Sequence, residues 1–263
     1  MKTFIYILFF TLMTSTMSAQ DIYKKFFLDN TVVAHRGAWK TKGLPQNSIE
    51  SLREAMRLGC AGTEFDVHMT ADSVMVLCHD NNFFGKVIEK HTYAELAEAK
   101  LPNGETIPTL EKALMEGMKQ TDTRLFLEVK SSSTKERTAL SAEKIVAMVN
   151  EMGAQPWVCY IAFDYDAVKR IKQLVPSAAV AYLSGDVAPG QLKNDKITGL
   201  DYHYNVFKKN ELMIKEAKEL GLSLNVWTVN SPEEMELFTD KNFEYITTDE
   251  PELLLSIKKS GKK

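Results

Sequence analysis

The chain has 263 residues, of which 44% are apolar and 25% are charged, with only 13 glycines and 8 prolines. This is the composition of a folded globular protein, and it excludes disordered, collagen-like and coiled-coil chains. The net charge of −3 excludes a domain-wide basic field of the kind that holds nucleic acid or an anionic membrane surface. An anionic ligand would therefore have to be attracted by local charges.

Residues 1–19 differ in pattern from the rest of the chain. Lys2 precedes an apolar run over Phe4–Met13, and small residues follow up to Ala19. The run is about half as long as a bilayer-spanning helix, which is typical of a secretory signal peptide. We predict that this segment exports the protein to the periplasm or the extracellular space. Residues 20–263 should then form one domain without stable membrane insertion.

Short β-branched runs alternate with segments of helical period from residue 31 onward. The runs lie at residues 32–35, 63–67, 74–79, 125–129, 158–163, 179–183, 197–202, 224–229 and 245–248. This alternation predicts parallel strands joined by crossover helices. About eight such units have the size of a (β/α)8 TIM-type barrel, so we predict this α/β fold. An open doubly wound sheet is the alternative, but no glycine-rich phosphate loop follows an early strand to support it.

Local signals refine the boundaries of these elements. Asn47, with Glu50 three residues later, is expected to cap a helix that Gly59 ends. Only residues 70–73 separate the second run from the third, so these two runs should form a hairpin. We interpret the stretch of about 81–108 as a long loop over one mouth of the barrel, a short insertion after the third strand.

Charged residues stand at the ends of the first four predicted strands, where a barrel carries its reactive groups. They are His35, Arg36, Glu64, Asp66, His79, Glu128 and Lys130. Alternate residues of a strand share a face, so Glu64 and Asp66 point the same way. By the same rule Glu128 lies beside Lys130. Three carboxylates that converge without thiolates or clustered imidazoles favour a hard cation, Ca²⁺ or Mg²⁺, over zinc.

Each of these residues also has a structural interpretation. A lone strand histidine is usually a hydrogen-bonded structural group, and Glu64 could pair with Arg36 and bind no metal. Charged groups at four successive strand ends nevertheless cost free energy on burial unless they pair or bind a ligand. Their joint occurrence therefore favours a functional site. The histidines without such a setting are interpreted as structural or surface residues, and these are His68, His91 and His203.

The chain carries, in order, the motifs AHRG, PQNS, GTEFDVHMTADSVMVLCHD, IPTLEKAL, LEVK, NVWTVN and ITTDEP. From Val32 to Pro251 this series resembles the glycerophosphodiester phosphodiesterase family. The resemblance implies a TIM barrel with one divalent metal ion. It also implies hydrolysis of a small glycerophosphodiester to glycerol 3-phosphate and an alcohol.

The resemblance also implies roles for individual residues. His35 and His79 match the family's acid and base, although which is the acid stays open. The family's metal ligands correspond to Glu64, Asp66 and Glu128. Its phosphate contacts correspond to Arg36 and Lys130, and its substrate-facing aromatic residue corresponds to Trp227. The family's usual PENT is PQNS here, so Gln46 replaces a carboxylate by an amide. We expect Gln46 and Asn47 to lie just behind the direct ligands, where the lost charge bears on metal affinity.

Residue chemistry and resemblance both point to phosphodiester hydrolysis, with water or a neighbouring glycerol hydroxyl as the nucleophile. A phospholipase C-like or D-like enzyme acting on intact lipid would use the same barrel with an exposed apolar rim. A zinc amidohydrolase would need histidine ligands clustered on one strand. A non-catalytic phosphate- or sugar-binding barrel would have little reason to keep both histidines. The expected substrate is a water-soluble compound such as glycerophosphocholine or glycerophosphoethanolamine.

Overall fold

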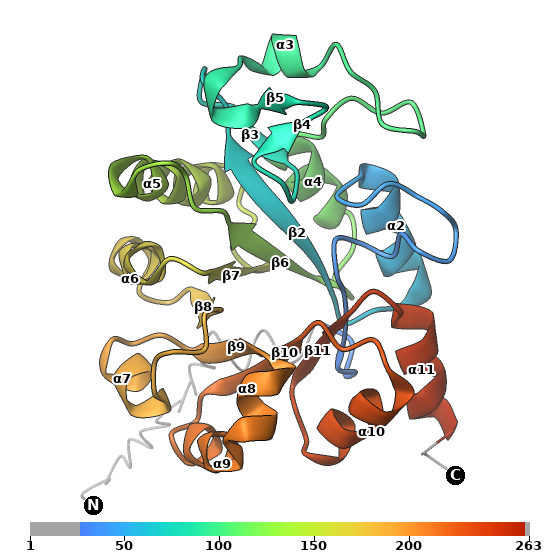
Figure 1. Cartoon of the computed structure of the whole chain (residues 1–263), viewed down its shortest axis with the longest axis vertical. Coiled ribbons are helices and arrows are strands. Elements are labelled where there is room, and N and C mark those ends of the chain that lie inside the picture. Colours follow the sequence, from blue (N-terminus) through green and yellow to red (C-terminus); the bar gives the residue numbers. More distant parts are fainter. Residues whose placement is uncertain (1–26, 261–263) are drawn as a thin grey trace, which may run out of the picture.

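The computed structural model describes residues 27–260. Its strands form a sheet in the order β1, β11, β10, β9, β8, β7, β6, β2 and β3, and β1 also pairs with β2 (Figure 1). The barrel strands span Val32–Ala34 (β1), Gly62–Met69 (β2), Arg124–Val129 (β6), Val158–Ala162 (β7), Ala179–Tyr182 (β8), Gly199–His203 (β9), Ser223–Trp227 (β10) and Tyr245–Thr248 (β11). Because β1 pairs in parallel with both β2 and β11, these strands close into the predicted (β/α)8 barrel.

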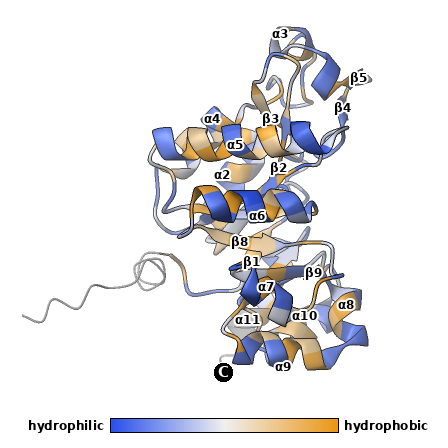
Figure 2. Ribbon diagram, turned by 90° about the vertical axis from the view of Figure 1, so that its left-hand side faces the viewer, coloured by the Kyte–Doolittle hydropathy of each residue, from blue (hydrophilic) through white to orange (hydrophobic). Residues whose placement is uncertain are grey.

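Helices surround the barrel and cover the outer side of the strands. They are α2 (Ile49–Leu58), α4 (Leu110–Gly117), α5 (Lys135–Glu151), α6 (Tyr165–Leu174), α7 (Pro189–Asn194), α8 (Tyr204–Lys209), α9 (Glu211–Glu219), α10 (Pro232–Asp240) and α11 (Pro251–Ser260). Figure 2 shows hydrophilic and hydrophobic residues side by side along α5 and α6. Such helices bury one face and leave the other in water. In the described residues, no helix has both the length and the apolar character needed to span a bilayer.

Alternate residues of each strand point to opposite sides of the barrel wall. On β2, Phe65 and Val67 belong to the main hydrophobic core between strands and helices. Phe126 on β6 belongs instead to a smaller cluster with Val33 and Ile161. A Cβ atom on Gly62 would meet the Phe126 ring at 2.5 Å, so the even-numbered positions of β2 share the side of Phe126. Side chains alternate along a strand with a period of two, so Glu64 and Asp66 lie on this same side of β2. It is the side opposite to Phe65 and Val67, and it faces the barrel interior.

The predicted hairpin is confirmed, and the insertion after it has more structure than the sequence indicates. β3 (Met75–Leu77) pairs antiparallel with β2. The stretch interpreted as a long loop contains β4 (Asn82–Phe83), β5 (Lys86–Val87), the 3₁₀ helix η1 (Ile88–Lys90) and α3 (Tyr93–Leu96). It stands beyond the end of β2, at the top of Figure 1. A separate apolar cluster holds it together, formed by Val76, Phe83, Ile88, Leu96 and Ile107.

The predicted start of the first helix is wrong by one residue. Ser48, not Asn47, caps α2, because the Ser48 hydroxyl accepts a hydrogen bond from the Ser51 N–H at 3.0 Å. Asn47 instead turns its side chain to β2. Gly59 ends the helix as predicted, in the left-handed conformation with φ 77°. The predicted signal peptide at residues 1–19 lies outside the described residues, and export stays a prediction.

Gly37 should tolerate no side chain, because an added Cβ would clash with Ser51 in addition to straining the backbone. Its φ is +83°, and an added Cβ would lie 2.3 Å from Ser51 Oγ and 2.6 Å from the Ser51 carbonyl carbon. Gly43 has a similar φ of +63° with nothing within 4 Å of such a Cβ. We expect Gly37→Ala to lower the free energy of unfolding by about 2–3 kcal/mol, and Gly43→Ala by about 1 kcal/mol. Urea unfolding of both variants checks this, and equal losses would contradict it.

Candidate active site

Three buried carboxylates meet inside the mouth of the barrel. Asp66 on β2 is the direct neighbour of Glu128 on β6 in the parallel register, and Glu64 lies one pleat before Asp66. One oxygen atom from each of the three side chains lies within 4.8 Å of the others. Their exposed fractions are 3% for Glu64, 1% for Asp66 and 8% for Glu128. The structure therefore concentrates negative charge where water is excluded.

Burial and mutual repulsion raise the pKa of two of these groups. Burial raises the pKa of Glu64 well above its ordinary value, and the charges of Asp66 and Glu128 raise it further. Burial and the charge of Asp66 also raise the pKa of Glu128. Among the described residues, Glu64 Oε1 has no hydrogen-bond partner although it is fully buried. A buried anion without a partner is costly, so this cluster requires a cation or a proton.

Asp66 is the best-satisfied member of the cluster. The Asn47 amide donates to Asp66 Oδ2 at 2.8 Å, and the Asp66 N–H donates back to Asn47 Oδ1 at 3.0 Å. Lys130 Nζ lies 3.1 Å from Asp66 Oδ1. Burial would raise the pKa of Asp66, but the Lys130 charge and the Asn47 hydrogen bond outweigh it and lower that pKa. Asp66 therefore stays ionised at neutral pH.

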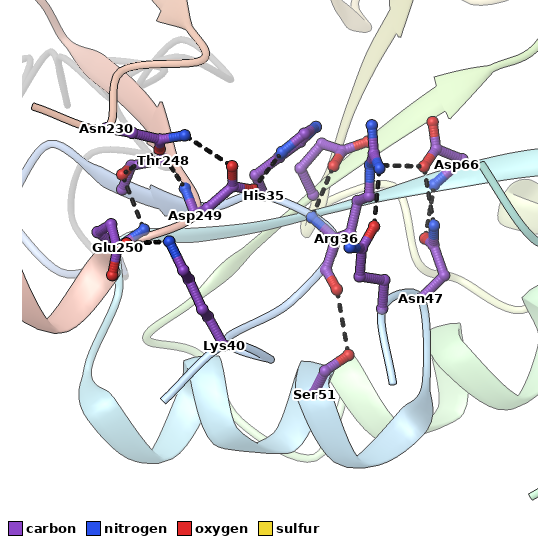
Figure 3. Close-up of polar contacts among 12 residues, drawn as sticks. His35, Arg36, Lys40, Asn47, Ser51, Asp66, Asn230, Thr248, Asp249 and Glu250 are labelled. Carbon is purple, nitrogen blue, oxygen red and sulfur yellow. Dashed lines mark hydrogen bonds and ion pairs between the residues drawn. The ribbon is translucent and has the colours of Figure 1, made fainter. Parts of the chain in front are cut away.

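Two cations flank the carboxylates. Lys130 Nζ bridges Asp66 and Glu128, at 2.9 Å from Glu128 Oε1. Arg36 Nε lies 3.7 Å from Asp66 Oδ2 (Figure 3). Arg36 Nη1 donates to Gln46 Oε1 at 2.7 Å. Glu64 Oε2 accepts from the backbone N–H of Arg36 at 2.9 Å. Glu64 thus accepts a hydrogen bond from the Arg36 backbone, in place of the Glu64–Arg36 ion pair considered from the sequence.

Each of the two candidate catalytic histidines has a carboxylate at its Nδ1 atom. His35 Nδ1 lies 2.7 Å from Asp249 Oδ1, and His79 Nδ1 lies 2.8 Å from Asp80 Oδ1. An ionised carboxylate only accepts hydrogen bonds, so each Nδ1 is the donor. In both rings Nε2 is then the nitrogen left for proton transfer. His68, interpreted from the sequence as structural or surface, is buried, and its Nε2 lies 3.4 Å from the His79 carbonyl oxygen.

A cavity of about 100 Å³ brings these groups to one space. Its lining comprises His35, Arg36, Glu64, His79, Glu128, Lys130, Ile161, Phe163, Leu183, Asp201, Trp227, Thr228 and Thr247. Trp227 forms one wall, with edge-to-face contacts to Phe163 at 5.5 Å and to His203 at 5.0 Å between ring centroids. Its indole N–H donates to the Asp201 carbonyl oxygen at 2.9 Å. Asp66 and Asn47 lie behind this lining.

Asp249 and Asp201 are not predicted from the sequence as residues of the site. Asp249 occurs in the motif ITTDEP, but as one of many acids near a strand end it carried no separate signal. Asp201 lies in the weakest predicted run. It is 1% exposed and accepts a hydrogen bond from Asn225 at 2.9 Å. Burial raises the pKa of Asp201 well above its ordinary value.

The mouth of the closed barrel thus brings together buried carboxylates, two cations and two histidines that each contact a carboxylate. Such a collection of titratable and charged groups in one cavity is typical of an enzyme active site. Residues 35–253 match the model of the glycerophosphoryl diester phosphodiesterase family. The match spans most of the chain, and the chain belongs to this family. It is therefore a phosphoric diester hydrolase.

Relatives agree with this membership. A glycerophosphodiester phosphodiesterase of Parabacteroides distasonis, known from a crystal structure, is 44% identical with a TM-score of 0.87, and the comparison covers 90% of this chain and 100% of that one. The glycerophosphodiester phosphodiesterase of Caldanaerobacter subterraneus is 27% identical over 251 residues, which cover 88% of this chain and 98% of the relative. A phosphodiesterase of Oleispira antarctica, solved in complex with the product sn-glycerol-3-phosphate, shares the fold at 22% identity, with a TM-score of 0.74 over 92% of this chain and 100% of that chain.

Proposed function

We propose that the protein cleaves glycerophosphodiesters to glycerol 3-phosphate and a free alcohol, with one divalent cation and with His35 and His79 as acid and base. The observation that carries this proposal is that two members of the buried carboxylate cluster, Glu64 and Glu128, line one cavity with both histidines, while Asp66 lies directly behind them. A phosphate-binding barrel without activity would need cations at this place. It would gain nothing from three anions that repel its ligand.

The donor groups fit a hard divalent cation. All three side chains offer carboxylate oxygens, and Glu64 Oε1 is buried without a partner in the described part of the chain. Oxygen-only donor sets suit Ca²⁺ or Mg²⁺. Glu64, Asp66 and Glu128 would hold the ion. When bound, it would supply positive charge that neutralises the phosphoryl group as the nucleophile arrives.

The chain's own cations and histidines would do the remaining work. Arg36 and Lys130 would contact the phosphoryl oxygens, since both line the cavity. One histidine would take a proton at Nε2 from the attacking water or glycerol hydroxyl. The other would give a proton at Nε2 to the alcohol oxygen as its bond to phosphorus breaks. Attack by the glycerol hydroxyl would close a cyclic phosphate, which water then opens.

The substrate we propose is a deacylated phospholipid headgroup compound such as glycerophosphocholine. Family membership and the product bound by the Oleispira antarctica relative support the glycerol phosphate part. Trp227 would cover the glycerol carbons, because its ring forms an apolar wall of the cavity. Recognition should therefore fall on the glycerol side and accept several alcohols.

The test is a substrate panel with the purified protein. It compares glycerophosphocholine, glycerophosphoethanolamine, bis(p-nitrophenyl) phosphate and intact phosphatidylcholine, each with and without chelator. We expect release of glycerol 3-phosphate and free choline, with loss of activity in chelator and recovery with Ca²⁺ or Mg²⁺. Preference for intact lipid, or release of phosphocholine, would contradict the proposal and favour a phospholipase.

We also propose that residues 1–19 act as the signal peptide and that residues 20–263 form the exported domain. The basis is the charged start, the apolar run and the small residues that follow. Cell fractionation with N-terminal sequencing of the exported form tests it. Full-length protein retained in the cytoplasm would contradict it.

Gln46→Glu should change metal affinity or the preferred cation more than stability. Gln46 is exposed, and its Oε1 accepts from Arg36 Nη1 at 2.7 Å. A carboxylate here would pair with Arg36 and weaken its pull on Asp66. We expect the free energy of unfolding to stay within about 0.5 kcal/mol. Calorimetric metal titration and kinetics check this, and identical metal affinity and kinetics in both proteins would show that the replacement is silent.

A further inference from the structure

The contact between His35 and Asp249 belongs to a larger arrangement. Asp249 Oδ1 binds His35 Nδ1 at 2.7 Å, and Asp249 Oδ2 accepts from Asn230 Nδ2 at 2.7 Å (Figure 3). Asn230 Oδ1 accepts from the backbone N–H of Asp249 at 2.9 Å and from the Thr248 hydroxyl at 3.2 Å. One amide side chain thus holds both the backbone and the carboxylate of Asp249. An amide can do this because its nitrogen donates while its oxygen accepts.

The barrel holds these residues at adjacent strand ends. His35 directly follows β1 and Asp249 directly follows β11, and the His35 N–H donates to the Thr248 carbonyl oxygen at 2.9 Å. Asn230 follows β10, the next strand in the sheet, and Val229 N–H donates to the Thr247 carbonyl oxygen at 2.9 Å. Backbone pairing between neighbouring strands therefore brings the three residues close together.

The structure assigns to Asp249 the role of a positioning residue that, held by Asn230, orients the His35 ring and keeps its Nε2 free for proton transfer. This role rests on the proposed function of His35. The hydrogen bond from Nδ1 selects the tautomer in which Nε2 is unprotonated. The carboxylate also stabilises the imidazolium that forms when Nε2 takes a proton.

The ionisation of Asp249 agrees with this role. Burial would raise the pKa of Asp249, but hydrogen bonds from His35 and Asn230, with the charges of His35 and Arg36, lower it below its ordinary value. The carboxylate is thus an anion at neutral pH. It can accept from both neighbours at once.

The hydrogen bond from Asn230 determines how the new side chain is oriented in the variant Asp249→Asn. In Asp249→Asn, the new amide must keep its oxygen toward the Asn230 amide nitrogen, because two N–H groups would otherwise oppose each other. Its own nitrogen then faces His35 Nδ1 and donates to it. The substitution should therefore move the His35 proton from Nδ1 to Nε2, with little change in shape.

The experiment compares wild type, Asp249→Asn, His35→Ala and the double variant, with Glu250→Gln as control. Glu250 follows Asp249 and pairs with Lys40 (Figure 3), so its substitution disturbs the same segment but not His35. We expect Asp249→Asn to lower kcat by about 10²-fold or more with KM and Tm nearly unchanged. The double variant should be no slower than His35→Ala. Glu250→Gln should stay near wild type.

Nitrogen NMR of the histidine rings gives a second readout that needs no turnover. The His35 signals are identified by their loss in His35→Ala, and we expect the protonated nitrogen to be Nδ1 in wild type and Nε2 in Asp249→Asn. A kcat unchanged in Asp249→Asn, additive losses in the double variant, or an unchanged tautomer would overturn the role of Asp249. A wild-type protein that cleaves no glycerophosphodiester would overturn the proposed function, and the NMR result would still decide the role of Asp249.

Should Asp249→Asn not fold, Asn230→Ala replaces it, with an expected loss of about tenfold in kcat. No loss there would also overturn the role.

Discussion

Replacing any one of Glu64, Asp66 and Glu128 by its amide should abolish turnover and sharply weaken binding of Ca²⁺ or Mg²⁺. A hard cation loses one anionic ligand of three, and the remaining oxygen is a weaker donor. The folded state should survive, because an amide has the same shape and each variant removes one of the buried charges. Burial, with the repulsion between these charges, raises the pKa of Glu64 and Glu128, and the repulsion is then reduced. Isothermal titration with each cation, beside thermal unfolding of the metal-free protein, measures both effects.

Glu54→Gln is the matched control for this series. Glu54 is also buried, at 6% exposed, but it pairs with Arg57 and Lys42 on the outer side of the barrel. The Arg57 hydrogen bond is the main cause that lowers the pKa of Glu54 from 4.5 to about 2. Its ion pairs therefore stabilise the protein above about pH 4.5, and this stability is lost as the pH falls toward 2. Glu54→Gln should lower stability at neutral pH by about 1 kcal/mol and leave cation binding intact.

The metal assignment fails if cation affinity is unchanged in all three site variants. It also fails if the three variants lose affinity no more than Glu54→Gln does. Loss of affinity with retained folding would support it.

The second large effect is expected at the histidines. His35→Ala and His79→Ala should each lower kcat/KM by about 10²- to 10⁴-fold, because each would remove one proton transfer. The protein should stay folded, since the His79 side chain is 43% exposed and His35 lies at a strand end. In the wild type, kcat/KM should follow a bell-shaped dependence on pH. Steady-state kinetics over a pH series measures these effects.

His91→Ala is the control for the histidine variants. His91 Nδ1 donates a hydrogen bond to the Val87 carbonyl oxygen at 2.8 Å within the insertion, and His91 does not line the cavity. We expect its kinetics to match the wild type within about twofold. An active His79→Ala enzyme would refute the scheme with two histidines.

Much of the fold follows from local patterns in the sequence. Alternation of β-branched runs with helical segments predicts the barrel, because each parallel strand needs a crossover helix to reach its neighbour. The short link at residues 70–73 predicts the hairpin for the same reason. The strand period of two also predicts that Glu64 and Asp66 share a face, and both lie in the barrel interior.

Competition between local and distant partners explains the errors. The sequence indicates Asn47 as a helix cap, since its side chain suits that position. In the structure Asp66 takes both hydrogen bonds of that side chain, and Ser48 caps the helix. The insertion similarly carries weak local signals, and its elements form because apolar residues from several short segments pack into one cluster.

The partners of the candidate site residues are set by closure of the barrel. The sequence by itself determines which side chains stand at strand ends, and hence the carboxylates, cations and histidines of the cavity. It contains no local sign that Asp249 meets His35, from which it is separated by 214 positions. That contact exists because the last barrel strand pairs with the first and places the two following residues side by side. Periodicity depends on neighbours in the chain, whereas this pairing depends on the whole ring of strands, so only the tertiary structure decided it.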